Sequence, residues 1–86
     1  MLLSVVIPVY NEEKLINKLL RKISNLKNLN KEIILINDGS TDSTKKVIEE
    51  NCTGLYDKFI NLGKNYGKGY ALRKGFELVK GDIIIV

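Results

Sequence analysis

Short apolar runs alternate along this chain with segments of helical pattern. Four runs rich in β-branched residues predict strands at Leu3–Pro8, Glu32–Asn37, Asp57–Asn61 and Asp82–Val86. The first two and the last are apolar at nearly every position rather than at every second one. Such runs are typical of strands that are covered on both faces, as in a parallel sheet.

The segments between these runs predict three helices. Asn11 is a suitable N-cap for the first, whose apolar residues recur with helical spacing at Leu15, Ile16, Leu19, Leu20 and Ile23. A second helix is expected over about 42–51, with Ser40 or Thr41 as its cap. The third ends before Gly81 and shows the same apolar spacing at Ala71, Leu72, Gly75, Phe76 and Val79.

The resulting order, β-α-β-α-β-α-β, indicates the α/β class. Right-handed helical crossovers between parallel strands place helices on both faces of the sheet, so we expect three layers. The strand order should be 3-2-1-4, which is half of a doubly wound, Rossmann-like domain. No internal repeat or linker interrupts the pattern, and residues 1-86 are expected to form one unit.

The amino-acid composition excludes several classes of protein. Eighty-six residues, 44% hydrophobic and 28% charged, are typical of one small folded domain rather than a disordered tail. The apolar runs are too short to cross a membrane, and the N-terminus lacks the basic region of a signal peptide. We therefore expect a cytoplasmic protein. With one cysteine, Cys52, and no histidine, an internal disulfide and the usual zinc sites are excluded.

The net charge of +4 comes from lysines spread along the chain. We find no basic run with interleaved aromatic residues, so a nucleic-acid partner is not expected. A mildly basic surface instead favours an anionic small ligand or an anionic membrane surface.

Polar residues follow the first two predicted strands, where ligands bind in doubly wound sheets. The candidates are Pro8, Tyr10 and Glu12 after the first strand, and Asn37 and Asp38 after the second. Backbone near Pro8 and the ring of Tyr10 suit a nucleobase, and the carboxylates of Glu12 and Asp38 suit ribose hydroxyls or a base N–H. Each residue alone also has an ordinary structural interpretation as a turn, a helix start or a packed aromatic.

A third candidate segment opens the last helix. The N–H groups of Gly67-Lys68-Gly69 and the charge of Lys68 could approach a diphosphate, although Lys68 alone is more typical of a solvated surface. No G-x-G-x-x-G follows the first strand, and Gly63–Lys68 departs from the P-loop in spacing. The usual dinucleotide and P-loop motifs are therefore absent.

Taken in order, four motifs resemble the N-terminal half of a family 2 glycosyltransferase with the GT-A fold. They are Ser4–Glu13, Glu32–Asp42, Asn61–Ala71 and Lys80–Val86, and the resemblance extends over nearly the whole chain. The most similar branch is that of the dolichyl- or polyprenyl-phosphate sugar synthases. This resemblance implies an inverting transfer of sugar from a UDP- or GDP-sugar to an acceptor such as a polyprenyl phosphate.

By position, the resemblance implies a nucleotide site in this chain. Pro8, Tyr10 and Glu12 would line the nucleoside pocket, and Asp38 would bind base or ribose with Asn37 beside it. Lys68 would lie near the diphosphate or the base.

The resemblance also implies parts that this chain does not contain. A divalent cation (Mg²⁺ or Mn²⁺) and a general base would be held by residues beyond Val86, so we expect no catalytic residue and no metal ligand within 1–86 and no transfer by this chain alone. Membrane contact is expected only through further segments or the lipid acceptor, at the cytoplasmic face. The exposed fourth strand predicts a homo-oligomer.

Two other functions stay open at this point. The same pocket would serve a nucleotide-binding module without catalysis. A structural or interaction domain would keep the fold and bind no nucleotide.

Overall fold

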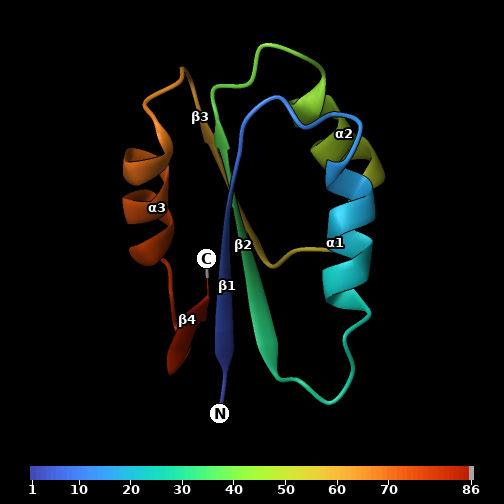
Figure 1. Cartoon of the computed structure of the whole chain (residues 1–86), viewed down its shortest axis with the longest axis vertical. Coiled ribbons are helices and arrows are strands. Elements are labelled where there is room, and N and C mark those ends of the chain that lie inside the picture. Colours follow the sequence, from blue (N-terminus) through green and yellow to red (C-terminus); the bar gives the residue numbers. More distant parts are fainter. Residues whose placement is uncertain (86) are drawn as a thin grey trace.

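The computed structural model describes residues 1–85 and shows the predicted α/β architecture (Figure 1). All strand pairings are parallel, and the four strands lie in the order β3-β2-β1-β4, as predicted. The strands are β1 (Leu3–Val9), β2 (Lys31–Asp38), β3 (Lys58–Leu62) and β4 (Ile83–Ile85). The helices are α1 (Ile16–Ser24), α2 (Thr44–Asn51) and α3 (Lys68–Phe76).

The helices cover the two faces of the sheet separately. In Figure 1, α1 and α2 lie on one side of the strands and α3 lies on the other. Strand β2 is buried on both faces because its residues alternate between two cores: Ile33 and Leu35 pack in one, and Ile34 and Ile36 in the other. This double coverage explains the uninterrupted apolar run that the sequence shows.

The two cores differ in size. The one under α1 and α2 contains seven buried residues: Val9, Ile16, Leu20, Ile33, Leu35, Ile48 and Cys52. The one under α3 contains four: Val6, Ile34, Ile36 and Ala71. Close contact on the α3 side depends on Gly75, where a Cβ atom would come within 2.5 Å of a methyl carbon of Val6.

Helix α1 begins later than the sequence predicts, and the assignment of Asn11 as its N-cap is wrong. Asn11 adopts a positive φ of 51° and lies five residues before the first helical residue. Its side-chain oxygen accepts a hydrogen bond from the backbone N–H of Thr41 at 2.8 Å. Asn11 therefore joins the loop after β1 to the loop after β2, a long-range role that local sequence does not reveal.

Helix α2 also begins later, at Thr44, and neither Ser40 nor Thr41 caps it. The carboxylate of Asp42 instead accepts from the Thr44 N–H at 2.9 Å. Partial burial raises the pKa of Asp42, but the hydrogen bonds from Thr44 and Glu13 outweigh it, and the pKa lies below its ordinary value. Asp42 thus supplies the anionic cap at the positive end of the helix.

Helix α3 ends at Phe76, before the predicted stop, and Val79 of its predicted apolar face lies beyond the helix. Strand β4 is shorter than predicted and pairs with β1 through Leu3–Val5 only. The last residue of the predicted strand, Val86, lies outside the described residues. Because β4 ends the strand order, its outer edge has no neighbour among the strands of residues 1–85.

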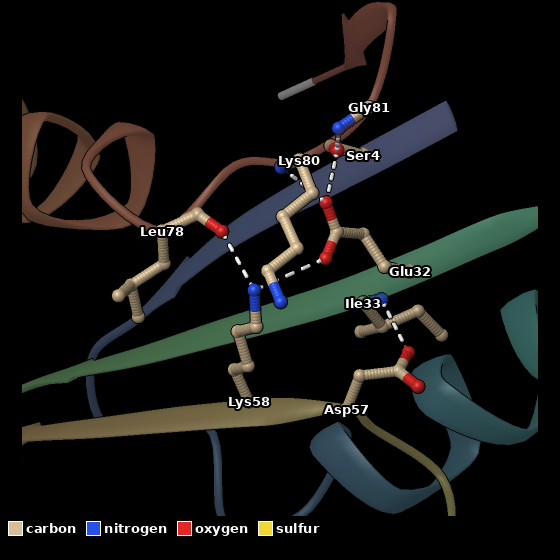
Figure 2. A network of polar contacts seen from close by, with 8 residues as sticks. All are labelled: Ser4, Glu32, Ile33, Asp57, Lys58, Leu78, Lys80 and Gly81. Atoms are coloured by element: carbon tan, nitrogen blue, oxygen red, sulfur yellow. Dashed lines mark hydrogen bonds and ion pairs between the residues drawn. The ribbon is translucent and has the colours of Figure 1, made fainter. Parts of the chain in front are cut away.

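A buried carboxylate, Glu32, fastens β4 to the rest of the sheet (Figure 2). Glu32 is 7% exposed and accepts hydrogen bonds from the Ser4 hydroxyl and, at 2.7 Å, from the backbone N–H of Lys80. The ammonium of Lys58 lies 3.4 Å from its other oxygen. The Ser4 hydroxyl in turn accepts from Gly81 N–H at 2.8 Å. Strands β1, β2 and β3 and the α3–β4 connection therefore meet at one carboxylate.

These contacts shift the titration of Glu32. The hydrogen bond from Ser4 lowers its pKa most; burial raises it, and the Lys80 N–H and Lys58 lower it further, so the folded pKa lies below the ordinary value of 4.5. A carboxylate with a depressed folded pKa contributes its stabilisation in full above the unfolded pKa. That contribution is lost as the pH falls through the folded value.

We predict that Glu32→Gln lowers the free energy of unfolding by roughly 1–3 kcal/mol at pH 7, because the Lys80 N–H and Lys58 lose a charged acceptor. The difference from the wild type should shrink as the pH falls below 4.5. Urea unfolding at several pH values measures both effects. The exposed Glu49→Gln is the matched control, and an equal loss in both variants, or a difference independent of pH, would contradict this assignment.

Candidate nucleotide-binding cleft

An open cleft of about 550 Å³ lies at the carboxyl ends of β1 and β2, beside the start of α3. Three segments far apart in the sequence form its wall. The lining residues are Pro8, Val9, Tyr10, Glu12, Asp38, Asn65, Gly67 and Lys68. The structure thus brings five of the six predicted site residues into one cavity.

The β1 side of the cleft is held by the loop after β2. The Glu12 N–H donates to the Thr44 hydroxyl at 2.8 Å, and the Asn11 N–H donates to Ser40 at 2.9 Å. These bonds fix the backbone of Tyr10–Glu12 but leave the side chains of Tyr10 and Glu12 exposed. Tyr10 is 46% exposed, so its ring is accessible to a planar ligand.

Asp38 forms the floor and holds the loop that precedes α3. The residue is 4% exposed. One carboxylate oxygen accepts the Tyr66 N–H at 2.8 Å, and the other accepts the Gly67 N–H at 3.0 Å and the Asn65 amide at 3.3 Å. Asp38 therefore positions the start of α3 as well as lining the cleft.

Gly39 allows this loop to approach so closely. It adopts a φ of +64°, and a Cβ atom there would lie 2.1 Å from the carbonyl carbon of Lys64. Neither the conformation nor the space accommodates another residue easily.

Asn37 is the one predicted site residue that does not line the cleft. It is buried, donates to the Asn61 side-chain oxygen at 2.7 Å and accepts from the Ser40 hydroxyl. Both the nitrogen and the oxygen of the Asn37 amide are thus hydrogen-bonded within the protein. Asn37 connects β2 to β3 and orients Ser40, which binds the loop after β1.

The remaining wall is the start of α3. Lys68 is the first residue of this nine-residue helix and is exposed, and Gly67 before it has a φ of +101°. The N–H groups in the first turn of a helix lack intrahelical acceptors and carry partial positive charge. The start of α3 therefore brings positive charge to the cleft beside the Asp38 carboxylate, while Glu12 lies on the β1 side.

Sequence reasoning missed Val9 and Asn65 as lining residues. Val9 lies between Pro8 and Tyr10 in the sequence, so its place in the same wall of the cleft could have been expected. Asn65 had no local signal: it reaches the cleft because its amide donates to the Asp38 carbonyl at 3.1 Å, a contact across 27 positions of the chain.

Two further findings bear on cofactors and membranes. Within residues 1–85, no group of three or more His, Cys, Asp or Glu side chains is placed to hold a metal ion. The described part of the chain also contains no helix of the length and apolarity needed to cross a bilayer.

Comparison with known proteins identifies the family. The sequence profile of glycosyl transferase family 2 matches residues 4–86, and the chain belongs to this family. The chain is 41% identical over 87 residues to an undecaprenyl-phosphate 4-deoxy-4-formamido-L-arabinose transferase of Pseudomonas fluorescens. That alignment covers 95% of this chain but 26% of the relative, so the chain spans about a quarter of the relative's length.

Solved structures confirm the GT-A fold. TarS of S. aureus, residues 1–349, superimposes with a TM-score of 0.80 at 29% identity, over 98% of this chain and 26% of TarS. The mannosyltransferase PcManGT of Pyrobaculum calidifontis, solved with GDP-Man and Mn²⁺, gives a TM-score of 0.85 at 23% identity, over 95% of this chain and 25% of that protein. The predicted fold class and family are thus confirmed.

We predict that Gly39→Ala displaces the loop 63–67 and opens one wall of the cleft. The added Cβ would overlap the Lys64–Asn65 peptide, so the bonds from Tyr66 and Gly67 to Asp38 should break. The cost is about 1–3 kcal/mol of stability. Amide hydrogen exchange at Tyr66 and Gly67 should accelerate.

The matched control is Gly63→Ala in the same loop, where no heavy atom lies within 4 Å of the added Cβ. It should leave both amides protected. Unchanged protection in Gly39→Ala would show that the loop does not depend on this close contact.

Proposed function

We propose that this chain is the nucleotide-binding part of an inverting glycosyltransferase that takes its sugar from a nucleotide-diphospho-sugar. The observation that carries the proposal is the convergence of Pro8, Tyr10, Glu12, Asp38 and Lys68 on one cleft. These residues come from three segments and meet where ligands bind in doubly wound sheets. Family membership supports the same conclusion.

In this proposal the nucleoside occupies the β1 side of the cleft, between Tyr10, Glu12 and Asp38. The exposed ring of Tyr10 packs against the base, and backbone near Pro8 contacts its edge. The carboxylate of Glu12 accepts hydrogen bonds from neutral ribose hydroxyls. Asp38 already accepts bonds from Tyr66 and Gly67, so its main contribution is to hold the wall, with its free acceptor capacity turned to the base or ribose.

The diphosphate occupies the α3 side of the cleft. Gly67 and Lys68 line the cleft at the start of α3, where first-turn N–H groups favour an anion. The ammonium of Lys68 supplies a full positive charge there. Lys68 and these N–H groups therefore favour placing the diphosphate at the start of α3.

The acceptor and the cation are proposed from relatives. The Pseudomonas relative is named as an undecaprenyl-phosphate 4-deoxy-4-formamido-L-arabinose transferase, which supports a polyprenyl phosphate as the acceptor of the sugar. PcManGT was solved with GDP-Man and Mn²⁺, which supports a GDP- or UDP-sugar and a divalent cation in the whole enzyme. Residues 1–85 provide no cluster for that cation, so we assign none of them to it.

We also propose that the open outer edge of β4 pairs with a second copy of the chain, since unpaired parallel edges recruit further strands. Sedimentation velocity should show a dimer or a larger species at high micromolar concentration. A stable monomer would contradict this part of the proposal.

The experiment that tests the proposed site is a calorimetric titration of the chain with UDP and with GDP. Lys68→Gln should weaken binding of the tighter diphosphate about tenfold, because one charged contact is lost. Its effect on the matching nucleoside should be small. The exposed Lys46→Gln on α2 changes the net charge equally and should leave both affinities unchanged.

Three outcomes would count against the proposal. No binding of either diphosphate at millimolar concentration would favour a structural or interaction domain. Equal effects of Lys68→Gln and Lys46→Gln would remove Lys68 from the diphosphate site. Nucleotide binding without transfer in any longer form of the protein would favour a non-catalytic module.

A further inference from the structure

We propose that the outer face of α3 docks this domain on an anionic membrane surface. The surface, which we call the α3 face, consists of Lys64, Tyr66, Tyr70 and Lys74. None of the four lines the nucleotide cleft. The inference rests on the proposed function in one respect, namely that the acceptor is a lipid phosphate.

The four side chains form a continuous ladder. The rings of Tyr66 and Tyr70 stack with centroids 4.3 Å apart and planes 19° from parallel. The ammonium of Lys64 lies over the Tyr66 ring at 5.1 Å, and that of Lys74 over the Tyr70 ring at 5.5 Å. Cation–π contacts of this kind hold charge and aromatic surface together at an exposed site.

The ladder points away from the sheet. Ala71 and Gly75, on the inner side of α3, are buried, whereas Tyr66 is 46% exposed and the Lys74 side chain 39% exposed. In Figure 1, α3 forms the outer layer on its side of the sheet, with no further element beyond it among residues 1–85. Within residues 1–85, no other element covers the α3 face.

The residue types of the α3 face, tyrosine and lysine, suit contact with an anionic bilayer. Tyrosine is enriched at membrane interfaces because its apolar ring and polar hydroxyl group suit the headgroup region. Each lysine near an anionic surface adds roughly 1 kcal/mol, or about fivefold, to binding. Between Gly63 and Lys80 the chain has five basic residues and one acidic residue, Glu77, which pairs weakly with Lys74 at 3.9 Å.

Helix α1 provides the informative comparison. The segment Lys14–Lys31 contains six basic residues, yet it has no aromatic residue. Its exposed apolar residues Leu19, Leu26 and Leu29 border a second groove, which runs along β1 from Leu3 to Pro8. That groove is lined by aliphatic residues and by one charged residue, Lys31, so it lacks the pairing of basic and aromatic side chains.

The α3 face adjoins the cleft. Gly67, between the two tyrosines in sequence, lines the cleft, and the Tyr66 N–H donates to Asp38 on its floor. A bilayer against the α3 face would therefore present a lipid phosphate close to the bound nucleotide. Sequence reasoning did not find this surface because glycines and an asparagine separate its residues, which meet only when the loop folds onto α3.

The test is co-sedimentation of the chain with vesicles. We expect binding to phosphatidylglycerol–phosphatidylcholine vesicles at low ionic strength and none to pure phosphatidylcholine. Lys64→Gln/Lys74→Gln should weaken binding about 30-fold, from two losses of about fivefold. Tyr66→Ala should also weaken it, whereas Tyr66→Phe, which keeps the ring, should weaken it less.

The control is Lys18→Gln/Lys22→Gln, which removes the same charge from exposed positions of α1. It should change vesicle binding by no more than a few-fold. An equal effect of the two pairs, no binding to anionic vesicles, or equally tight binding to a single-stranded oligonucleotide would overturn the proposal. Nucleotide affinity, which neither pair should alter, reports separately on the proposed function.

Discussion

Two buried carboxylates at opposite ends of β2 fasten α3 to the sheet, and the cleft depends on both. At the carboxyl end, Asp38 accepts the N–H groups of Tyr66 and Gly67, directly before the helix. At the amino end, Glu32 accepts the N–H of Lys80, after the helix (Figure 2). Both acids are less than a tenth exposed. Because a buried charge is costly unless it is fully hydrogen-bonded, these bonds fix the segments on either side of α3.

This arrangement explains why a small chain can hold a defined site. The core under α3 has four fully buried residues, fewer than the core on the other face. The carboxylates add directional contacts at each end of the helix. Lys68 and the first turn of α3 are thereby placed opposite the loop after β1, which is held separately through Asn11, Glu12 and Thr44. The cleft lies between these two loops. The loop before α3 is anchored to the end of β2, and the loop after β1 is anchored to the loop after β2.

The class and order of the elements follow from the sequence because buried parallel strands have a clear pattern. The runs at Val5–Ile7 and Ile33–Ile36 admit no other interpretation in a chain with three helical segments between strands. The helix starts were predicted less well. Asn11 does not cap α1 because its side-chain oxygen accepts from the N–H groups of Thr41 and Asp42, about 30 positions away, and local sequence does not reveal such bonds.

The same distinction applies to the site. Pro8, Tyr10, Glu12, Asp38 and Lys68 were predictable because they follow strands or open a helix, at positions that the topology brings together. The positions of Asn65 and of the buried Asn37 side chain were not, because they depend on side-chain bonds to residues distant in sequence, Asp38 and Asn61 respectively. The role of Asp38 in holding the loop was likewise invisible, since a carboxylate before a glycine looks the same in a simple turn.

Binding of a nucleoside diphosphate between these two anchored loops can be mapped by the amide shifts of the ¹⁵N-labelled chain during titration with UDP or GDP. We expect saturable shifts that are confined to residues 9–12, 38–40 and 65–69. Amides at the opposite end of the sheet, such as those of Glu32 and Lys80, should not move. Saturable shifts centred instead on the groove between α1 and β1, or no saturable shifts with either nucleotide, would contradict this binding site.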